Sequence, residues 1–204
     1  MVNLKPTEKE IYKWNDELSK IRQEIKKLQD KESIIINNLS YSIKMHENKS
    51  ELDLSTRLRN RAVEIAISKT GIKELTGKND GPAIEEIQEN IRWLIDQKAA
   101  WCASFVSYCF AMAAKDIGIK RPFEHIPGVY TLTQLAKKQG WYFDAGTKPP
   151  QRGDVFVMSN DHTGFVQDVI GSSIKTIEGN YQNQVGSRPL PIVGQITGYI
   201  RVVI

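Results

Sequence analysis

The sequence lacks the features that mark membrane, secreted and nucleic-acid-binding proteins. Its 204 residues contain no run of about eighteen apolar residues, so we expect no transmembrane helix. The N-terminal residues MVNLKPTEKE have no apolar h-region of a secretory signal peptide. The net charge is only +4, and no dense block of Lys and Arg indicates nucleic acid. The hydrophobic fraction of 40% allows a globular core, and the length favours one domain with an accessory segment.

Cysteine is also scarce, which excludes a disulfide framework. Cys102 and Cys109 are seven residues apart in one predicted helix, where the rise between them is about 10 Å. A disulfide needs Cα atoms closer than about 7 Å, so the two cannot pair with each other. Unpaired cysteines fit a reducing compartment or a thiol that is kept free for chemistry. We interpret Cys109 as a core residue, the commoner role of a cysteine on a buried helix face.

The first 45 residues predict a helical, coiled-coil-like arm. Apolar residues recur at alternating spacings of three and four, and the pattern continues less cleanly beyond Leu28: Ile11, Trp14, Leu18, Ile21, Ile25, Leu28, Ile35 and Leu39. About four such heptads are typical of a coiled coil. The arm could fold back as a hairpin, pair with another chain through residues 8–43, or dock on the rest of the molecule. We favour a structural arm over a recognition arm.

The remainder predicts a linker at 46–55 and one α+β domain at 56–204. The linker is polar and without periodicity. One helix is expected around Leu58–Ala66 and a second from Pro82, a residue suited to the first helical position, through Ile95. The last 65 residues consist of short apolar runs between turns, which is typical of an antiparallel sheet, with a long loop over 182–197. Helices followed by strands indicate the α+β class.

The helix predicted over Trp101–Ala114 carries the candidate nucleophile. Its apolar residues recur at helical spacing and form one continuous face. Cys102 lies in the first turn, where unpaired backbone N–H groups and the positive end of the helix dipole favour an anion. A thiolate is such an anion, so we expect Cys102 to ionise easily and to act as a nucleophile.

A thiolate nucleophile needs a base within hydrogen-bonding reach and a group that orients the base. The chain has three histidines. His46 falls in the predicted linker and is expected to be solvated, and His125 falls in the predicted loop 118–128, where a surface position is expected. His162 begins a predicted strand directly after a turn, so its imidazole can sit at a sheet end and face a helix terminus. We therefore choose His162 as the base.

The next predicted strand supplies candidates for the orienting group. Side chains alternate across a strand, so Thr176, Glu178 and Asn180 share one face. Either Glu178 or Asn180 could accept the imidazole N–H and hold the correct tautomer. Adjacent antiparallel strands bring such residues within side-chain reach of each other. Alone, Glu178 would be interpreted as a solvated strand residue; together with Cys102 and His162, we favour a catalytic interpretation.

These residues resemble the CHAP domains of the NlpC/P60 cysteine-peptidase superfamily. The matching pieces are WCASFV, PPQRGDVFVM, HTGFVQDV and the triplet EGN at 178–180, with a similar lead-in at GIKELTGKNDGPAIEEIQ. The resemblance covers about residues 57–204. It implies a papain-like core, with an antiparallel sheet of about five or six strands packed on the Cys102 helix. The Asp-rich calcium loop of many phage CHAP domains has no counterpart here, so no metal or other cofactor is expected.

The resemblance also implies an amidase or endopeptidase that acts on peptidoglycan. Cys102 would be the nucleophile, His162 the general base and then acid, Glu178 the orienting residue and Asn180 a fourth polar member of the site. Two alternatives stay open: an inactive wall-binding module with the arm as interaction element, and a cysteine amidase with a non-wall substrate or a role as a delivered toxin. We expect synthesis in the cytoplasm, with the cell wall reached by non-classical release or delivery.

Overall fold

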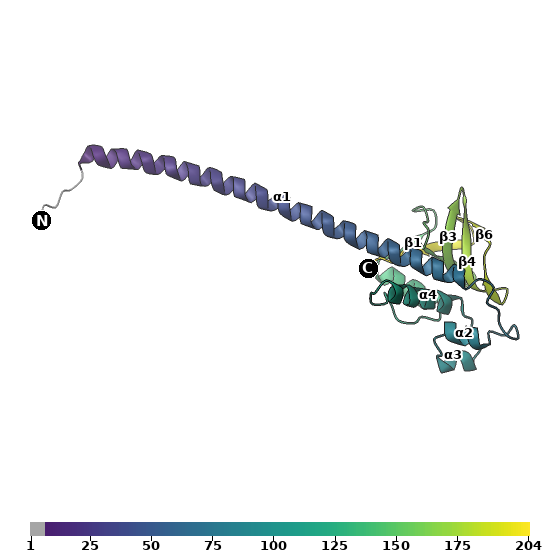
Figure 1. Cartoon of the computed structure of the whole chain (residues 1–204). Coiled ribbons are helices and arrows are strands. Elements are labelled where there is room, and N and C mark those ends of the chain that lie inside the picture. Colours follow the sequence, from purple (N-terminus) through teal and green to yellow (C-terminus); the bar gives the residue numbers. More distant parts are fainter. Residues whose placement is uncertain (1–6) are drawn as a thin grey trace. The chain divides into compact units, whose positions relative to one another are not determined.

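The computed structural model describes residues 7–204, and it describes side chains for 7–44 and 53–204 (Figure 1). The chain divides into two units, residues 1–50 and 51–204, which are described separately. The side chain of His46 and the first six residues of the predicted arm lie outside the described residues. None of the described helices is long and apolar enough to cross a membrane.

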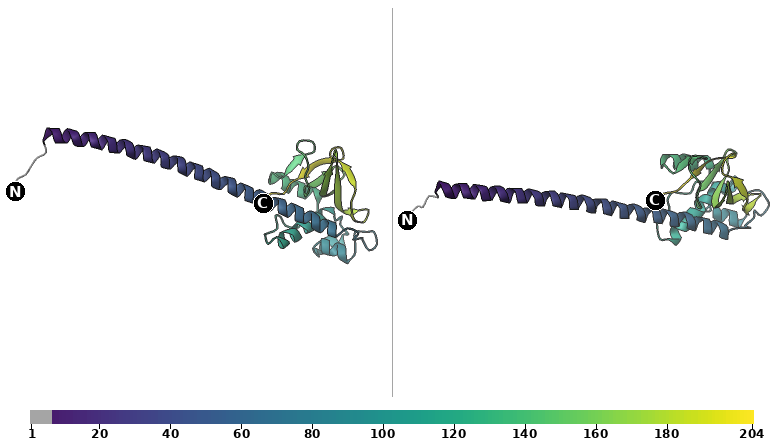
Figure 2. Two further views of the ribbon diagram at one scale, coloured as in Figure 1. Left: turned by 45° about the horizontal axis from the view of Figure 1, so that its top comes forward. Right: turned by 90° about the horizontal axis from the view of Figure 1, so that it is seen from above.

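Helix α1 (Glu8–Ser68) supplies all of the described structure of the first unit. It begins with a capping box, in which the backbone N–H and the hydroxyl of Thr7 both donate to Glu10 Oε2 (2.8 and 2.7 Å). The predicted helical arm is confirmed for residues 8–44, whose side chains are exposed. Both views in Figure 2 show α1 as one unbroken helix, which excludes the hairpin alternative.

The backbone of the predicted linker at 46–55 is helical and forms part of α1. The predicted division of the chain into an arm (1–45), a linker (46–55) and a domain (56–204) therefore stays a prediction. Beyond it, Leu58, Ala62 and Ala66 are fully buried, as their helical spacing predicts. Arg59 is buried beside them and donates from Nη1 to the carbonyl of Val202 (2.8 Å), which ties α1 to the C-terminus.

Within residues 7–204, four further helices follow, all of them before the first strand: α2 (Pro82–Ile87), α3 (Arg92–Asp96), α4 (Cys102–Asp116) and α5 (Val129–Lys138). The single helix expected from Pro82 to Ile95 is wrong, because it is two short helices. Glu89 and Asn90, between them, have φ angles of 53° and 54°. Two consecutive residues in the left-handed region cannot continue a right-handed helix.

Within residues 7–204, seven strands form one antiparallel sheet in the order β1-β7-β2-β3-β4-β5, with β6 paired to β4. Their bounds are β1 (Tyr142–Asp144), β2 (Val155–Met158), β3 (Thr163–Ile170), β4 (Ser173–Tyr181), β5 (Gln184–Gly186), β6 (Pro189–Pro191) and β7 (Ile196–Ile200). The α+β class and the antiparallel sheet are thus confirmed. The sheet exceeds the expected five or six strands because β5 and β6 lie in the segment predicted as a loop.

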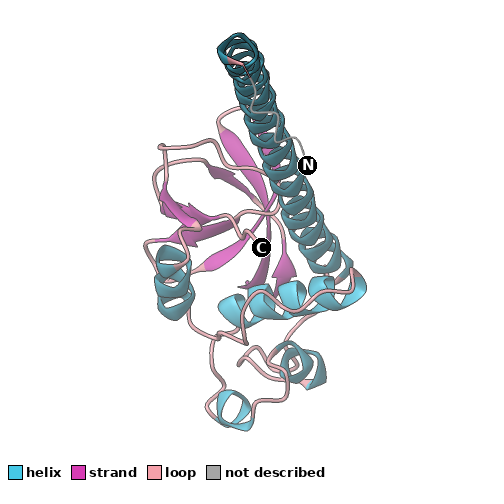
Figure 3. Ribbon diagram, turned by 90° about the vertical axis from the view of Figure 1, so that its left-hand side faces the viewer, coloured by secondary structure: helices cyan, strands magenta, loops and turns pink. Residues whose placement is uncertain are grey.

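Helix α4 is the central element of the second unit, and it packs against β3 and β4. The short helices α2 and α3 lie on the side of α4 away from the sheet (Figure 3). A Cβ built on Gly179 of β4 would lie only 2.5 Å from Cβ of Phe105, so glycine allows the strand to approach the helix. This close contact fixes the first turn of α4 relative to the polar end of β4.

Candidate active site

Cys102 is the first residue of α4 and is only 5% exposed. Trp101 precedes it with a non-helical conformation and no side-chain cap on the helix. The backbone N–H groups of the first turn are therefore available around the sulfur. The carbonyl of Trp101 accepts the N–H of Phe105 (2.8 Å), the first hydrogen bond of the helix. The predicted position of Cys102 at a helix start is confirmed.

His162 lies immediately before β3, with its ring between Cys102 and Glu178. Its Nε2 is 2.7 Å from Glu178 Oε2, and the Cys102 side chain is near enough to raise the pKa of the ring. Because Nε2 contacts the carboxylate, Nδ1 is the nitrogen left to face the sulfur. Burial alone would lower the pKa of His162, but the interactions with Cys102 and Glu178 outweigh it and raise the pKa to about 9.

Glu178 is a fully buried carboxylate on β4 with partners for both of its oxygens. Arg188 donates from Nε to Oε1 (2.9 Å) and from Nη2 to Oε2 (3.0 Å), and the hydroxyl of Thr176 also donates to Oε1. Burial raises the pKa of Glu178, but the hydrogen bonds from His162, Arg188 and Thr176 outweigh burial and lower it. The group facing His162 is therefore an anion at neutral pH.

Gly164 leaves the space in which Glu178 reaches His162. A Cβ built on Gly164 would lie 2.9 Å from Cγ of Glu178, closer than real Cβ atoms approach other atoms. The glycine of the HTGF segment thus allows the carboxylate to extend over β3. This explains in physical terms why a residue without a side chain stands two positions after the histidine.

Asn180 contacts Trp101, the residue before the nucleophile, and not His162. Its φ angle is 57°, a left-handed conformation that Asn tolerates better than most residues. With its amide oriented to suit its neighbours, Oδ1 accepts the backbone N–H of Trp101 (3.2 Å) and Nδ2 donates to Glu74 Oε1 (3.1 Å). Asn180 therefore contacts the residue that precedes Cys102.

Glu74 completes this second polar group, which sequence reasoning missed. The carboxylate is buried and accepts the indole N–H of Trp101 at Oε1 (2.9 Å) and the backbone N–H of Asn79 at Oε2 (2.8 Å). The predicted lead-in segment thus contacts Trp101, the residue directly before α4, through Glu74. The resemblance of GIKELTGKNDGP was the available signal, but it did not say which residue of the segment contacts Trp101.

The other cysteine and the other described histidine are both buried away from the pair. Cys109 is fully buried and unpaired, as predicted, and burial raises the pKa of its thiol. The surface position expected for His125 is wrong, because its side chain is buried with Nε2 3.1 Å from Ser104 Oγ and Nδ1 3.3 Å from Glu89 Oε1. Burial lowers the pKa of His125 and outweighs the opposite effect of Glu89.

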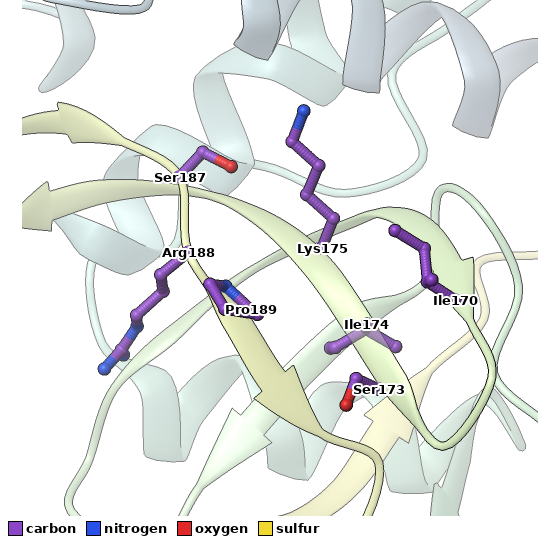
Figure 4. Close-up of a pocket in the computed structure, with 7 residues that line it drawn as sticks. All are labelled: Ile170, Ser173, Ile174, Lys175, Ser187, Arg188 and Pro189. Carbon is purple, nitrogen blue, oxygen red and sulfur yellow. The ribbon is translucent and has the colours of Figure 1, made fainter.

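Two cavities are lined by residues that are neighbours of the site residues in sequence or contact them, although neither is lined by Cys102 or His162. One, of about 390 Å³, is bounded by the β2–β3 turn next to His162 and by α5, with Ser159, Asp161, Tyr130 and Gln134 in its lining. The other, of about 420 Å³, lies along β4 and β6: Ile170, Ser173, Ile174, Lys175, Ser187, Arg188 and Pro189 (Figure 4). Figure 4 shows the Arg188 side chain directed away from Ile174. The guanidinium of Arg188 binds Glu178.

Comparison with known proteins assigns the central part of this site to a family. Residues 95–180 match the CHAP domain. The match contains Cys102, His162, Glu178 and Asn180, and the resemblance to CHAP domains noted from the sequence is confirmed over this range. Glu74 and Arg188, which contact the same residues, lie outside the range that matches the CHAP domain.

Two solved structures are similar to the chain: the crystal structure of Ly7917, and that of Ly7917 with the hydrolyzing product of MDP. Each is 14% identical over 70% of this chain, with a TM-score of 0.42. The chain spans about three fifths of their length, 61% and 62%. No curated protein matches it. Within residues 7–204, no group of three or more metal-ligating side chains is present; the expectation of no metal stays a prediction.

Proposed function

We propose that the second unit is a cysteine amide hydrolase that cleaves peptidoglycan, with Cys102 as nucleophile, His162 as acid and base, and Glu178 as the orienting residue. The CHAP match over residues 95–180 supports hydrolysis as the class of reaction. The observation that carries the proposal is the placement of His162, whose Nε2 contacts the buried Glu178 carboxylate while the nearby Cys102 side chain raises the pKa of the ring. Nucleophile, base and orienting group in this order form a catalytic triad.

In the proposed reaction, the Cys102 thiolate attacks the carbonyl carbon of the scissile amide. The oxyanion forms beside the backbone N–H groups of the first turn of α4, which have no side-chain cap. His162 gives the proton on Nδ1 to the leaving amine, the C–N bond breaks, and a thioester remains. Water then loses a proton to His162 and attacks the thioester, which releases the acid and restores the thiolate.

The cavity next to His162 supports a polar substrate on the leaving-group side. His162 delivers the proton to the amine, so the amine-bearing part of the substrate must lie on the side of the histidine. The cavity there combines tyrosine with hydroxyl, amide and carboxylate groups. Such a lining suits a peptide or glycopeptide better than a hydrocarbon chain. Both an N-acylmuramoyl amidase and a crosslink endopeptidase fit this description.

The test is release of soluble fragments from purified sacculi. We expect Cys102→Ala and His162→Ala each to lower the rate by several orders of magnitude, because triad members act as a unit. Cys109→Ala is the matched control: it removes the other thiol of the same helix, and its rate should stay close to that of the wild type. Circular dichroism checks that each variant is folded. Equal release by wild type and both site variants would refute the proposal.

Mass spectrometry of the products identifies the bond. An amidase leaves free lactyl groups on the glycan and releases peptides with a new amine at their first residue. An endopeptidase leaves the peptide stems on the glycan and opens the crosslinks between them. A defined digest with neither product, but with wild-type binding to sacculi, would favour the wall-binding module.

Alkylation of the thiol separates the enzyme from the binding module independently of the substrate. An enzyme needs a reactive Cys102, whereas a binding module does not. We expect iodoacetamide to label Cys102 much faster in the wild type than in His162→Ala, because the histidine stabilises the thiolate. Fast labelling with no activity on sacculi would point to a cysteine amidase with another substrate.

A further inference from the structure

The first part of α1 has an apolar seam on its surface, which the proposed function does not use. The seam residues lie at alternating three- and four-residue steps as far as Leu28, with Glu32 at the core position before Ile35, and are 43–65% exposed: Ile11, Trp14, Leu18, Ile21, Ile25, Leu28, Ile35 and Leu39. Isolated apolar residues on a surface are normal, but a continuous stripe of this length marks an interaction site. The seam therefore needs a partner.

The helix itself limits what that partner is. A hairpin is excluded, because α1 runs from Glu8 to Ser68 without a break. The seam between Ile11 and Leu28 is narrow, since its flanking positions are charged or amide residues. A strict two-position seam of this width is the geometry of a two-stranded coiled coil, whereas packing on a globular surface takes a broader face. The occupant that fits is thus one other helix with the same period.

The charges beside the seam are self-complementary. In a parallel, in-register pair, the residue directly before every second core position, here the residue before Ile11, Leu18 and Ile25, faces the residue five positions later in the other helix. Glu17 then faces Arg22 of the second copy, and the contact occurs twice by symmetry. Glu10 and Glu24 face the amides Asn15 and Gln29 at the equivalent steps. None of these three flanking pairs, which span residues 10–29, brings two like charges together.

The one charged residue within the seam also fits a second copy. Glu32 occupies a core position between Leu28 and Ile35. In the parallel, in-register pair it packs against Glu32 of the second copy, and Lys31 of each copy flanks the two carboxylates and can offset their like charge. A single polar residue at such a position lowers stability but specifies register and number of strands. A partner without a lysine at this level would leave Glu32 unpaired.

We propose that the chain forms a parallel, in-register homodimer through residues Ile11–Leu39. The partner is a second copy of this chain, bound along the seam. Because residues 51–204 follow the paired segment in each chain, one assembly contains two copies of the second unit. This inference does not depend on the proposed hydrolase activity, and either can fail alone.

The first experiment measures the mass of the full-length chain by analytical ultracentrifugation over a range of concentrations. We expect the mass of two copies, with Leu18→Lys giving a monomer because it buries a charge in the seam. Gln23→Lys is the matched control: it adds the same charge on the opposite face and should stay dimeric. A wild-type monomer at every concentration, or a mass of three or more copies, would overturn the proposal.

The second experiment tests register and partner through charge and crosslinking. Glu17→Arg and Arg22→Glu should each weaken the dimer, and the double exchange should restore it. Trp14→Cys, near one end of the seam, should form a disulfide between copies only if the helices are parallel and in register. Dimer stability that does not change in Glu17→Arg and Arg22→Glu would contradict the proposed pairing. So would the absence of a disulfide between copies of Trp14→Cys under oxidation.

Discussion

At the residue scale, the chemistry depends on how firmly Glu178 is held as an anion. The carboxylate is fully buried, so it would be protonated more easily without its neighbours. Arg188 reaches both of its oxygens, and its guanidinium also lies 4.5 Å from the ring of Tyr181. A bidentate arginine fixes both the charge and the direction of a carboxylate. In the proposed reaction, Arg188 is thus a positioning residue that acts on His162 through Glu178.

We predict that Arg188→Ala lowers kcat roughly tenfold with little change in KM, which is the cost of about one charged hydrogen bond. The pKa of Glu178 should rise, because arginine now lowers it. The acid limb of the pH–rate profile should therefore move to higher pH. Arg152→Ala is the matched control, since Arg152 donates instead to the carbonyl of Gln167 (2.7 Å). An unchanged acid limb in Arg188→Ala would show that the arginine has only a structural role.

The sequence predicts the site residues that stand in strong local patterns and misses those that depend on the fold. Cys102 was found from helix periodicity, and His162 from its place after a turn. Arg188 stands in a segment with two prolines and no periodicity, interpreted as a loop. Its contact with Glu178 exists because β6 pairs with β4, a pairing between residues that no local pattern encodes. The sequence predicts Asn180 as a polar member of the site, but its contact with Trp101 needs the three-dimensional structure.

At the scale of elements, the site is held by the contact between α4 and β4. Trp101 and Phe105 meet edge to face, with ring centroids 6.3 Å apart, directly over Gly179. The strand carries Glu178 and Asn180 on either side of this glycine. A shift of either element would move the carboxylate away from the histidine. Close packing and catalytic geometry therefore depend on the same contact.

We predict that Gly179→Ala destabilises the fold by about 1–3 kcal/mol, the usual cost of overpacking a core. The new methyl would meet Phe105 Cβ at 2.5 Å and a ring carbon of Trp101 at 2.9 Å. The check is the midpoint of urea unfolding. Gly128→Ala is the control, because the nearest atom to its Cβ, at 3.6 Å, leaves ordinary room. Equal midpoints for Gly179→Ala and wild type would contradict this account of the contact.

Element boundaries were harder to predict than element types. The break between α2 and α3 comes from left-handed Glu89 and Asn90, which hydrophobic spacing does not reveal. Conversely, residues 46–55 have no apolar period, yet their backbone continues the helix. Periodicity records only the faces on which apolar residues recur, so a polar helical segment gives no such signal.

At the scale of the whole molecule, the core belongs to residues 51–204. The end of α1 is part of this core, and the C-terminus is bound to it. Ser55 accepts the backbone N–H of Ile204 (3.0 Å) and donates to the carbonyl of the same residue (3.3 Å). Ser55 lies one residue before the domain start predicted from the sequence. The folding unit should therefore include it.

We predict that a chain of residues 51–204 folds and hydrolyses soluble peptidoglycan fragments at the rate of the full chain. A chain of residues 56–204 should unfold at a lower temperature, because it lacks the Ser55 contact with Ile204. Thermal unfolding and initial rates on the same fragments provide the comparison. A longer fragment that does not fold, or two fragments of equal stability, would show that this boundary is wrong.

The central claim is that His162 is held as an imidazolium between the Cys102 sulfur and the Glu178 carboxylate. An NMR titration of its ring nitrogens in the full-length chain, assigned with His162→Gln, tests this claim most directly. The account predicts a midpoint near pH 9 in the wild type, and a lower midpoint in Cys102→Ala, because the sulfur contributes to the raised pKa. A wild-type midpoint at or below about 6.5, the ordinary value for histidine, would contradict it.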